Sequence, residues 1–369
     1  MNRLVVGNLV HRPLRSMISI SAVAIEIIMI LSIAAIMLGM LNDQKTRTSG
    51  IGMDMIVRPG NTTYLSGVGG APIPVKVGDV LKKIDHVEVA APAIVQLTTG
   101  SAVENIYGID FDSYNALRPF TFIEGGPFKT PTDIIVDDYF ARADHGHKVG
   151  DTVEVLKHPF RISGIVEHGK GGRKFIQITT MGELIGSENH ASVFYLKLDN
   201  NDAATEEAVK KQIKATPGMS DYQAQTIDEW LSLMTPDHLP AFTAALYTVI
   251  GIAVVIGFLV VFQSMYTAVM ERTREIGVLK SMGASRLYIV RVVLSETGLL
   301  AICGIAVGIA LTYAVRSALH LRFPTLAFYL TGPWLFRAAL TAFIGAIAGA
   351  AYPAYKAARK DPIDALAYE

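Results

Sequence analysis

The feature that most constrains this chain is a set of long runs without ionised side chains. Residues 239–270 contain no Asp, Glu, Lys or Arg, and neither do residues 297–315 or 338–355. Residues 17–41 hold a single charged residue, Glu26. Because about 20 apolar residues, each rising roughly 1.5 Å, cross the hydrocarbon core of a bilayer, the four runs predict four transmembrane helices.

The first apolar run follows a basic N-terminus, as the core of a secretory signal peptide does. Signal-peptide cores span about 7–15 residues and precede a cleavage site of small residues. This run is longer, and the stretch that follows, "MLGMLNDQK", has no A-x-A pattern. A retained helix is therefore favoured over a cleaved one.

The distribution of Lys and Arg predicts the orientation of the helices. Short segments rich in these residues stay in the cytoplasm. They are concentrated in residues 1–16, 271–290 and 356–369, and are fewer in residues 316–336. We therefore expect both termini and the 271–290 insert to be cytoplasmic, and residues 42–238 to lie on the opposite side of the membrane.

Residues 42–238 are expected to form a folded α+β domain. "DTVEVL", "FRISGIVEHG" and "SVFYLKLD" are rich in β-branched and aromatic residues and read as strands, whereas "DAATEEAVKKQIKAT" has the period of an amphipathic helix. Cys303, the only cysteine, lies in the third apolar run. The domain must therefore be held together by a hydrophobic core without disulfides.

The fold class predicted from these patterns is an α-helical membrane protein with four transmembrane helices and a large α+β extracytoplasmic domain between helices one and two. The expected order along the chain is a cytoplasmic N-terminus (1–16), helix one (17–41), the outer domain (42–238), helix two with an extended stalk (239–270), a cytoplasmic helix and turn (271–290), helix three (291–315), an external loop (316–336), helix four (337–355) and a cytoplasmic tail (356–369).

Patterns that would indicate an enzyme are weak. The phosphate-binding pattern G-x-x-x-x-G-K-[ST] does not occur in the sequence. "HGKGGRK" (168–174) is expected to be a flexible hairpin tip, and "GNTTYLSGVGGAP" (60–72) a mobile loop, with contact to a substrate or partner as the less favoured alternative. His145 and His147 beside Asp144 could reach a metal, but a solvated turn explains them more simply. The sequence therefore argues against an enzyme.

Glycines and acids inside or next to the apolar runs predict helix contacts. Two G-x-x-x-G patterns would let helix backbones approach closely, either within one chain or between two copies: Gly304 with Gly308, and Gly345 with Gly349. Glu26 lies near mid-depth, where a carboxyl is costly and usually faces a bundle interior. A protonated or hydrogen-bonded carboxyl that fixes helix packing is favoured for it, and handling of substrate or protons is the alternative. Glu296 is expected to be an interfacial charge.

The charged insert between the second and third apolar runs has the features of an exposed helix. Oppositely charged residues stand three positions apart, which stabilises a helix in water: Glu271 with Arg274, and Arg272 with Glu275. Ile276, Leu279 and either Met282 or Gly283 fall on one face, whereas Lys280 and Arg286 fall on others. An apolar ridge flanked by charges fits a groove on a partner protein, and a solvated connector is the simpler alternative.

Two stretches resemble a known family. "ERTREIGVLKSMGASRLYIVRVVLSETGLL", followed by a Gly-rich apolar run, resembles the FtsX-type permease domain of bacterial ABC transporters. "YPAYKAARKDPIDALAYE" resembles the usual end of that domain. One helix before a large outer domain and three after it is the layout of the MacB and LolC/LolE group, also called type VII or mechanotransmitting systems. The resemblance covers essentially the whole chain.

This resemblance implies a permease dimer in the bacterial inner membrane, either a homodimer or a related heterodimer, with two copies of an ABC ATPase subunit on its cytoplasmic side. ATP and Mg would be bound by that partner, so no cofactor is expected in this chain. A periplasmic adaptor is an optional further partner, the lipid bilayer surrounds the helices, and nucleic acid is not expected. The positions that match the family's ATPase-coupling helix are Glu271, Arg272, Glu275, Ile276, Gly277, Leu279, Lys280, Gly283 and Ala284.

The function that the resemblance implies is that of a non-catalytic permease subunit. ATP hydrolysis in a separate ATPase subunit would move the periplasmic domain and so export or extract periplasmic or membrane cargo. As a helix, residues 239–270 would be about 48 Å long against roughly 30 Å of hydrocarbon, which fits a lever that projects from the bilayer. The alternative is a mechanotransmitting regulator, of a signal or of a cell-wall hydrolase, that transports nothing.

Overall fold

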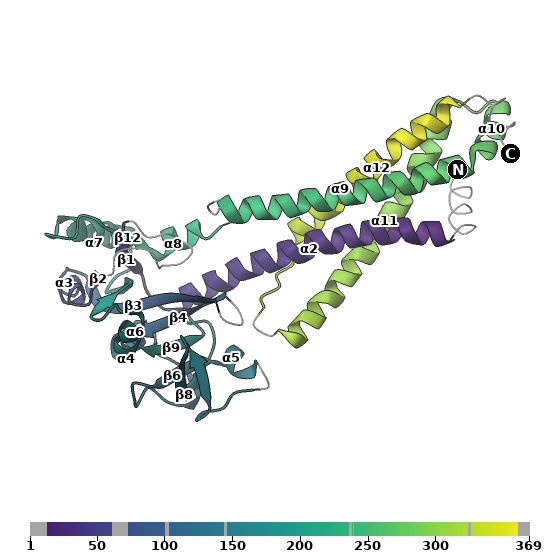
Figure 1. Ribbon diagram of the computed structural model, residues 1–369. Helices are drawn as coiled ribbons and strands as arrows, with labels where there is room; N and C mark the ends of the chain where they lie inside the picture. The colour runs from purple at the N-terminus through teal and green to yellow at the C-terminus, as the bar shows by residue number, and fades with distance from the viewer. Residues whose placement is uncertain are drawn as a thin grey trace. The chain divides into compact units, whose positions relative to one another are not determined.

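The computed structural model describes residues 13–60, 73–99, 103–143, 146–235, 238, 240–323 and 326–360. The chain divides into two compact units. The helical unit comprises residues 1–40, 240–322 and 326–369, and the sheet unit comprises residues 41–239 with 323–325. Figure 1 shows both units, with most of their elements labelled.

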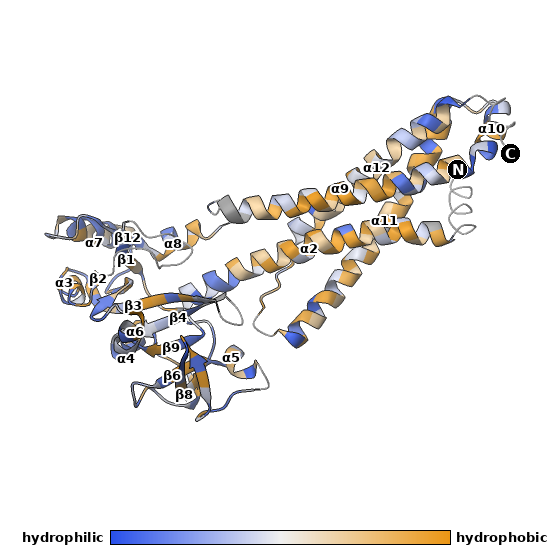
Figure 2. Ribbon diagram, in the orientation of Figure 1, coloured by the Kyte–Doolittle hydropathy of each residue, from blue (hydrophilic) through white to orange (hydrophobic). Residues whose placement is uncertain are grey.

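Four helices in the described residues are long and apolar enough to cross a membrane. Figure 2 shows hydrophobic residues along most of their length and hydrophilic ones at α10 (Thr273–Ser281). With the α+β domain between the first and second of them, they confirm the predicted fold class. The four helices are α2 (Pro13–Gly50), α9 (Pro240–Glu271), α11 (Arg286–Arg322) and α12 (Gly332–Arg359).

A stripe of alanines on α12 forms the centre of the helical unit. Every fourth residue from Ala338 to Ala354 is a buried alanine. Residues four apart lie on one face of a helix, and side chains this small let neighbouring helices approach closely. The stripe shares one core with apolar side chains of α9 and α11, such as Val261 and Leu300. Small residues therefore set the packing of this unit.

The sheet unit is built on one mixed sheet, which has ten strands in the part of the chain that the structure describes. Its order is β12-β1-β11-β3-β4-β9-β6-β8-β5, and β7 pairs with β8. Neighbouring strands are antiparallel except β4 with β9 and β6 with β8, which are parallel. The strands are β1 (Met55–Pro59), β3 (Val87–Thr99), β4 (Val103–Ile109), β5 (Phe122–Gly125), β6 (Asp133–Asp137), β7 (Thr152–Val155), β8 (His158–Val166), β9 (Lys174–Gln177), β11 (Val193–Leu198) and β12 (Tyr222–Thr226); β2 (Ile73–Pro74) pairs separately with β10 (His190–Ala191).

Both faces of the sheet are covered. Along β11, Tyr195 belongs to one hydrophobic core, whereas Phe194 and Leu196 on either side of it belong to another. This alternation follows from the two-residue period of a strand. The core that contains Tyr195 is rich in aromatic rings, among them Tyr114 and Phe175, whose centroids lie 6.0 Å apart.

Short helices connect the strands, and four of them begin at a capping side chain. Asp110, Asp137, Asp202 and Thr226 each accept a hydrogen bond from the backbone N–H three residues on, which satisfies a donor that the first helical turn leaves open. The helices are α3 (Val77–Leu81), α4 (Phe111–Leu117), α5 (Asp138–Arg142), α6 (Ile178–Ile185), α7 (Ala203–Ala215) and α8 (Ile227–Leu233). The helix expected from "DAATEEAVKKQIKAT" is α7.

Candidate functional site

Helix α10 follows α9 and is separated from α11 by a tight turn. Gly283 has a φ of +93°, a left-handed conformation that suits glycine and ends the helix. The N–H of Gly283 bonds to the carbonyl of Lys280, and that of Ala284 to the carbonyl of Leu279. The hydroxyl oxygen of Ser285 then accepts a hydrogen bond from the N–H of Tyr288 at 3.2 Å and so caps the start of α11. The turn therefore fixes the position at which α10 ends.

One side of α10 packs on the helical unit itself. Thr273 and Gly277 are buried, and Ile276, Leu279 and Ala284 are half-buried against the core formed by α9, α11 and α12. The apolar ridge that the sequence pattern assigns to a partner's groove, Ile276 and Leu279, thus contacts the chain's own helices.

The opposite side of α10 is open. Glu271, Arg274 and Glu275 are exposed. Val278 is 42% exposed and Met282 71% exposed. These two apolar residues lie four positions apart and therefore on one helix face. The sequence pattern grouped Met282 with Ile276 and Leu279, but Ile276 and Leu279 pack on the core whereas Met282 is exposed beside Val278.

A buried ion pair fixes the start of α10 to α11. The guanidinium of Arg272 lies 3.0 and 3.2 Å from the two carboxylate oxygens of Glu296. Only 11% of the Arg272 side chain and 9% of the Glu296 side chain are exposed. The turn after α10 thus brings Arg272 to Glu296, a partner that the sequence pattern did not indicate, and whether Glu296 lies at the membrane interface stays a prediction.

A second contact fixes the end of α10 to the end of α12. The ammonium of Lys280 donates to the backbone carbonyl of Ala358 at 3.1 Å and to that of Lys360. The last carbonyls of a helix lack partners within the helix and carry partial negative charge, so a lysine there is favourable. Together with the Arg272 pair, this contact ties α10 to both helices that follow it.

The glycines of both G-x-x-x-G patterns face other helices of the same chain. A Cβ added at Gly304 would lie 2.7 Å from the Cβ of Val23, and one added at Gly308 would lie 2.7 Å from the Cβ of Ile27, both on α2. A Cβ at Gly349 would lie 2.9 Å from the carbonyl of Phe258 on α9. At Gly345 the nearest atom would be a carboxylate oxygen of Glu26, at 3.8 Å.

Glu26 is enclosed by helices of the helical unit and is 3% exposed. It also lies against Gly257 of α9, where an added Cβ would be 1.9 Å from Oε2. Within the described part of the chain its Oε1 has no hydrogen-bond partner. The carboxyl thus occupies a notch that glycine leaves open.

Other candidates from the sequence are only partly covered by the described residues. No group of three or more His, Cys, Asp or Glu that could hold a metal occurs among the described residues. Asp144, His145, most of the Gly-rich stretch 60–72 and the tail 361–369 lie outside the described residues.

The stretch "HGKGGRK" is not the flexible hairpin tip expected from its composition. Lys170 and Arg173 are each 7% exposed, and Gly171 and Gly172 are buried. The side chain of Lys170 lies over the ring of Phe120, with Nζ 3.9 Å from the ring centroid. The prediction was wrong because the glycines serve close approach rather than flexibility: a Cβ at Gly172 would lie 2.5 Å from the ring of Tyr107.

Comparison with known proteins gives two matches to family models. The model for the FtsX-like permease C-terminal domain matches residues 247–362, and that for the MacB-like periplasmic core domain matches residues 16–216. The second match covers more than half of the chain and includes the sheet unit through α7.

Relatives in two domains of life align with long parts of the chain. A macrolide export ATP-binding/permease protein MacB from a Shewanella species is 26% identical over 97% of this chain and 59% of that protein. An uncharacterized ABC transporter permease from Methanocaldococcus jannaschii is 24% identical over 60% of this chain and 58% of that protein. MacB from Escherichia coli is 28% identical over 71% of this chain and 43% of that protein. The chain thus spans about three-fifths or less of the length of these relatives.

Proposed function

This chain belongs to the family of FtsX-like permeases that carry a MacB-like periplasmic core domain, and we propose that it is the membrane subunit of an ABC transporter. In this proposal, ATP hydrolysis in separate ATPase subunits moves the membrane helices and, through them, the sheet unit. The movement exports or extracts cargo from the periplasm or the membrane. ATP and Mg are bound by the ATPase subunits, and the permease contributes no catalytic residue.

The anchoring of α10 is the observation that carries this proposal. A helix that receives force must be fixed to the elements that it moves. Arg272 ties one end of α10 to Glu296 on α11, and Lys280 ties the other end to the carbonyls at the end of α12. Between these contacts, Ile276 and Leu279 pack against the core of the helical unit. A displacement of α10 is therefore passed to α11 and α12.

The exposed side of α10 supplies a docking surface for the ATPase subunit. Val278 and Met282 are the apolar residues on this side, and Arg274 and Glu275 flank them with opposite charges. Apolar residues desolvated at the centre of an interface contribute most of its affinity, whereas charges at the rim mainly set its register. We assign the anchoring role to Val278 and Met282 in place of Ile276 and Leu279.

The proposal is tested by truncating the exposed pair. A Val278→Ala, Met282→Ala variant should insert and fold as the native chain does, because neither side chain supports the core. Each truncation at a docked interface costs about 1 kcal/mol or more, so two should weaken binding of the ATPase subunit by about 30-fold or more. Co-purification of the ATPase subunit and its ATP hydrolysis in the complex are the measurements.

A matched control distinguishes docking from a general effect of lost apolar surface. Leu340 and Ile344 on α12 are also exposed and four positions apart, 47% and 58% respectively. A Leu340→Ala, Ile344→Ala variant should bind the ATPase subunit normally. If the Val278, Met282 variant binds and functions like the native protein, α10 is a solvated connector and the proposal is wrong.

A further inference from the structure

The last turns of α2 belong to the sheet unit, and they are bound closely to the loop that joins β8 to β9. Residues 41–50 of α2 and the loop, residues 167–173, are both parts of that unit. The N–H of Gly171 donates to the carbonyl of Arg47 at 2.8 Å, and the guanidinium of Arg47 donates to the carbonyl of Gly171 at 3.1 Å. Helix and loop are thus joined by two hydrogen bonds that run in opposite directions.

Glycines let the two backbones touch. A Cβ built at Gly50 would lie 1.6 Å from the carbonyl oxygen of Gly169, so only glycine fits at the end of this helix. Gly169 and Gly171 have φ values of +102° and +76°, in the left-handed region that glycine adopts most readily. The Gly-rich sequence of the loop therefore shapes it to the surface of α2.

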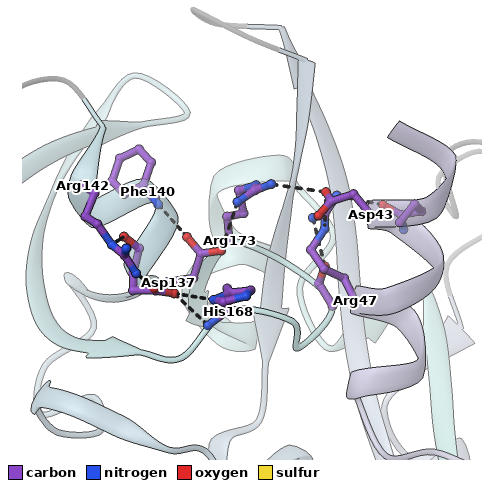
Figure 3. Close-up of polar contacts among 10 residues, drawn as sticks. Asp43, Arg47, Asp137, Phe140, Arg142, His168 and Arg173 are labelled. Carbon is purple, nitrogen blue, oxygen red and sulfur yellow. Dashed lines mark hydrogen bonds and ion pairs between the residues drawn. The ribbon is translucent and has the colours of Figure 1, made fainter. Parts of the chain in front are cut away.

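A row of alternating charges runs from the last turns of α2 to the end of β6. Arg173 lies between two carboxylates, 3.2 Å from Asp43 on α2 and 3.4 Å from Asp137 at the end of β6 (Figure 3). Asp43 also pairs with Arg47 at 3.0 Å, one helical turn further along α2. Asp137 is 1% exposed, and Arg173 is 9% exposed at its side chain. Ion pairs this buried are strongly disturbed when one partner is removed, unlike pairs in water.

The loop is in turn anchored to the interior of the sheet unit. The Lys170 ammonium lies 3.9 Å from the ring centroid of Phe120, and the hydroxyl of Tyr114 donates to the Lys170 carbonyl at 3.4 Å. The N–H of His168 donates to the carboxylate of Asp138, in the first turn of α5, at 2.9 Å. The side of the loop facing α2 and the side facing the core are therefore both held by specific contacts.

We propose that residues 168–173 and Asp137 form a socket that fixes the last turns of α2 to the strands β6, β8 and β9 of the same unit, with Asp43 and Arg47 as the positioning residues on the helix. The helix is continuous from Pro13 to Gly50, and its earlier residues belong to the helical unit. A displacement of α2 then enters the sheet unit at this socket and reaches β6, β8 and β9 directly. The role of the socket in transport rests on the proposed function, whereas its rigidity does not.

The test uses the full chain in lipid nanodiscs with its ATPase subunit, and it measures backbone hydrogen exchange. In the variant Asp43→Arg, Arg47→Asp, the helix keeps two opposite charges one turn apart, but each faces the wrong partner in the socket. We expect amides of residues 44–50 and 169–173 to exchange about tenfold faster or more, with β3 and β11 unchanged. The change in exchange that ATP produces in β8 and β9 of the native complex should be lost.

Two further variants keep the test decisive. Arg47→Lys retains the charge beside Asp43 but not the planar group that reaches Gly171; it should give a smaller acceleration at the same amides, even if the reversed variant does not fold. Glu207→Gln removes an exposed ion pair on α7 and should change nothing at the socket.

The possible results distinguish a failure of the socket proposal from a failure of the proposed function. Unchanged exchange at residues 44–50 in the reversed variant would show that the socket does not fix the helix. Faster exchange with a full ATP response would show that the socket is a folding contact only and would overturn the inference. If the native complex gives no ATP response, the proposed function fails, and local exchange alone then decides whether the socket is rigid.

Discussion

Substitutions at Gly304 and Gly308 test how α11 packs against α2. An alanine Cβ at Gly308 would lie 2.7 Å from the Cβ of Ile27 and 2.9 Å from the carbonyl oxygen of Ala24. Ordinary contacts between such atoms are about 3.5–4.0 Å. A backbone carbonyl cannot rotate away, so α11 must move outward by about 1 Å. Overpacking of this kind typically costs about 1–3 kcal/mol.

The pair should show less than additive effects. A Cβ at Gly304 would meet Val23 and the carbonyl of Ile20, one turn earlier on the same helix. One outward movement of α11 relieves both clashes, and neighbouring sites that share a backbone shift are not additive. We therefore expect Gly304→Ala, Gly308→Ala to destabilise the chain by less than the sum of the two single variants.

Thermal unfolding of the purified full chain in detergent measures these effects. A loss of 1 kcal/mol lowers the midpoint of a unit of this size by about 2–4 °C. Gly251→Ala is the matched control, because nothing lies within 4 Å of a Cβ at that position of α9; it should be neutral or slightly stabilising. If Gly308→Ala is as stable as Gly251→Ala, α11 does not pack on α2 as described. A change in the dimer fraction without a change in stability would place these glycines between two copies instead.

Three further perturbations test other parts of the molecule. Glu26→Gln should fold and keep most activity, because a neutral amide fills the same notch; complete loss of activity in a well-folded variant would favour a role in substrate or proton handling. Burial lowers the pKa of Lys170 from 10.5 to about 8, so between these values the unfolded chain binds the extra proton and stability should rise with pH. Lys170→Met should flatten that rise between pH 8 and 10 in thermal unfolding, and an unchanged slope would assign it to other groups. In a Cys303→Ser background, an impermeant thiol reagent added outside cells should label Asn200→Cys and not Ser285→Cys, and the reverse pattern would invert the expected orientation.

The membrane helices could be predicted because their signal is local. A run of uncharged residues is visible without knowledge of any neighbour, and each of the four runs overlaps one of the four long helices. The family resemblance rested on similarly local stretches. Neither the four long helices nor the family resemblance required knowledge of tertiary contacts.

The faces of α10 could not be predicted in the same way. In so short a helix, Met282 at its end can be grouped with Ile276 and Leu279 or with Val278. Which pair is buried depends on where α9, α11 and α12 lie. The partner of Arg272 was missed for the same reason, because Glu296 is 24 residues away and no spacing rule connects them.

The Gly-rich loop shows a different limit. Glycine permits both flexibility and close approach, and composition does not distinguish the two. The loop is held in place by its contacts with Gly50 and Arg47 on α2, which lie more than 100 residues earlier in the chain. The ion pair between Asp43 and Arg173 could not be predicted either, because each residue is ordinary in its own segment and 130 residues separate them.

If α10 receives the force of ATP hydrolysis, movement must pass from α10 to the sheet unit, and a distance measurement tests this transmission directly. Spin labels at Asn200→Cys in the sheet unit and Ser317→Cys on α11, both exposed positions, would be introduced in the Cys303→Ser background. Distances between the labels would be recorded in nanodiscs with the ATPase subunit, with ADP and with trapped ATP. We predict a shifted distance distribution with ATP that is absent in the Val278→Ala, Met282→Ala variant. Identical distributions in both nucleotide states, in a complex that hydrolyses ATP, would contradict the claim.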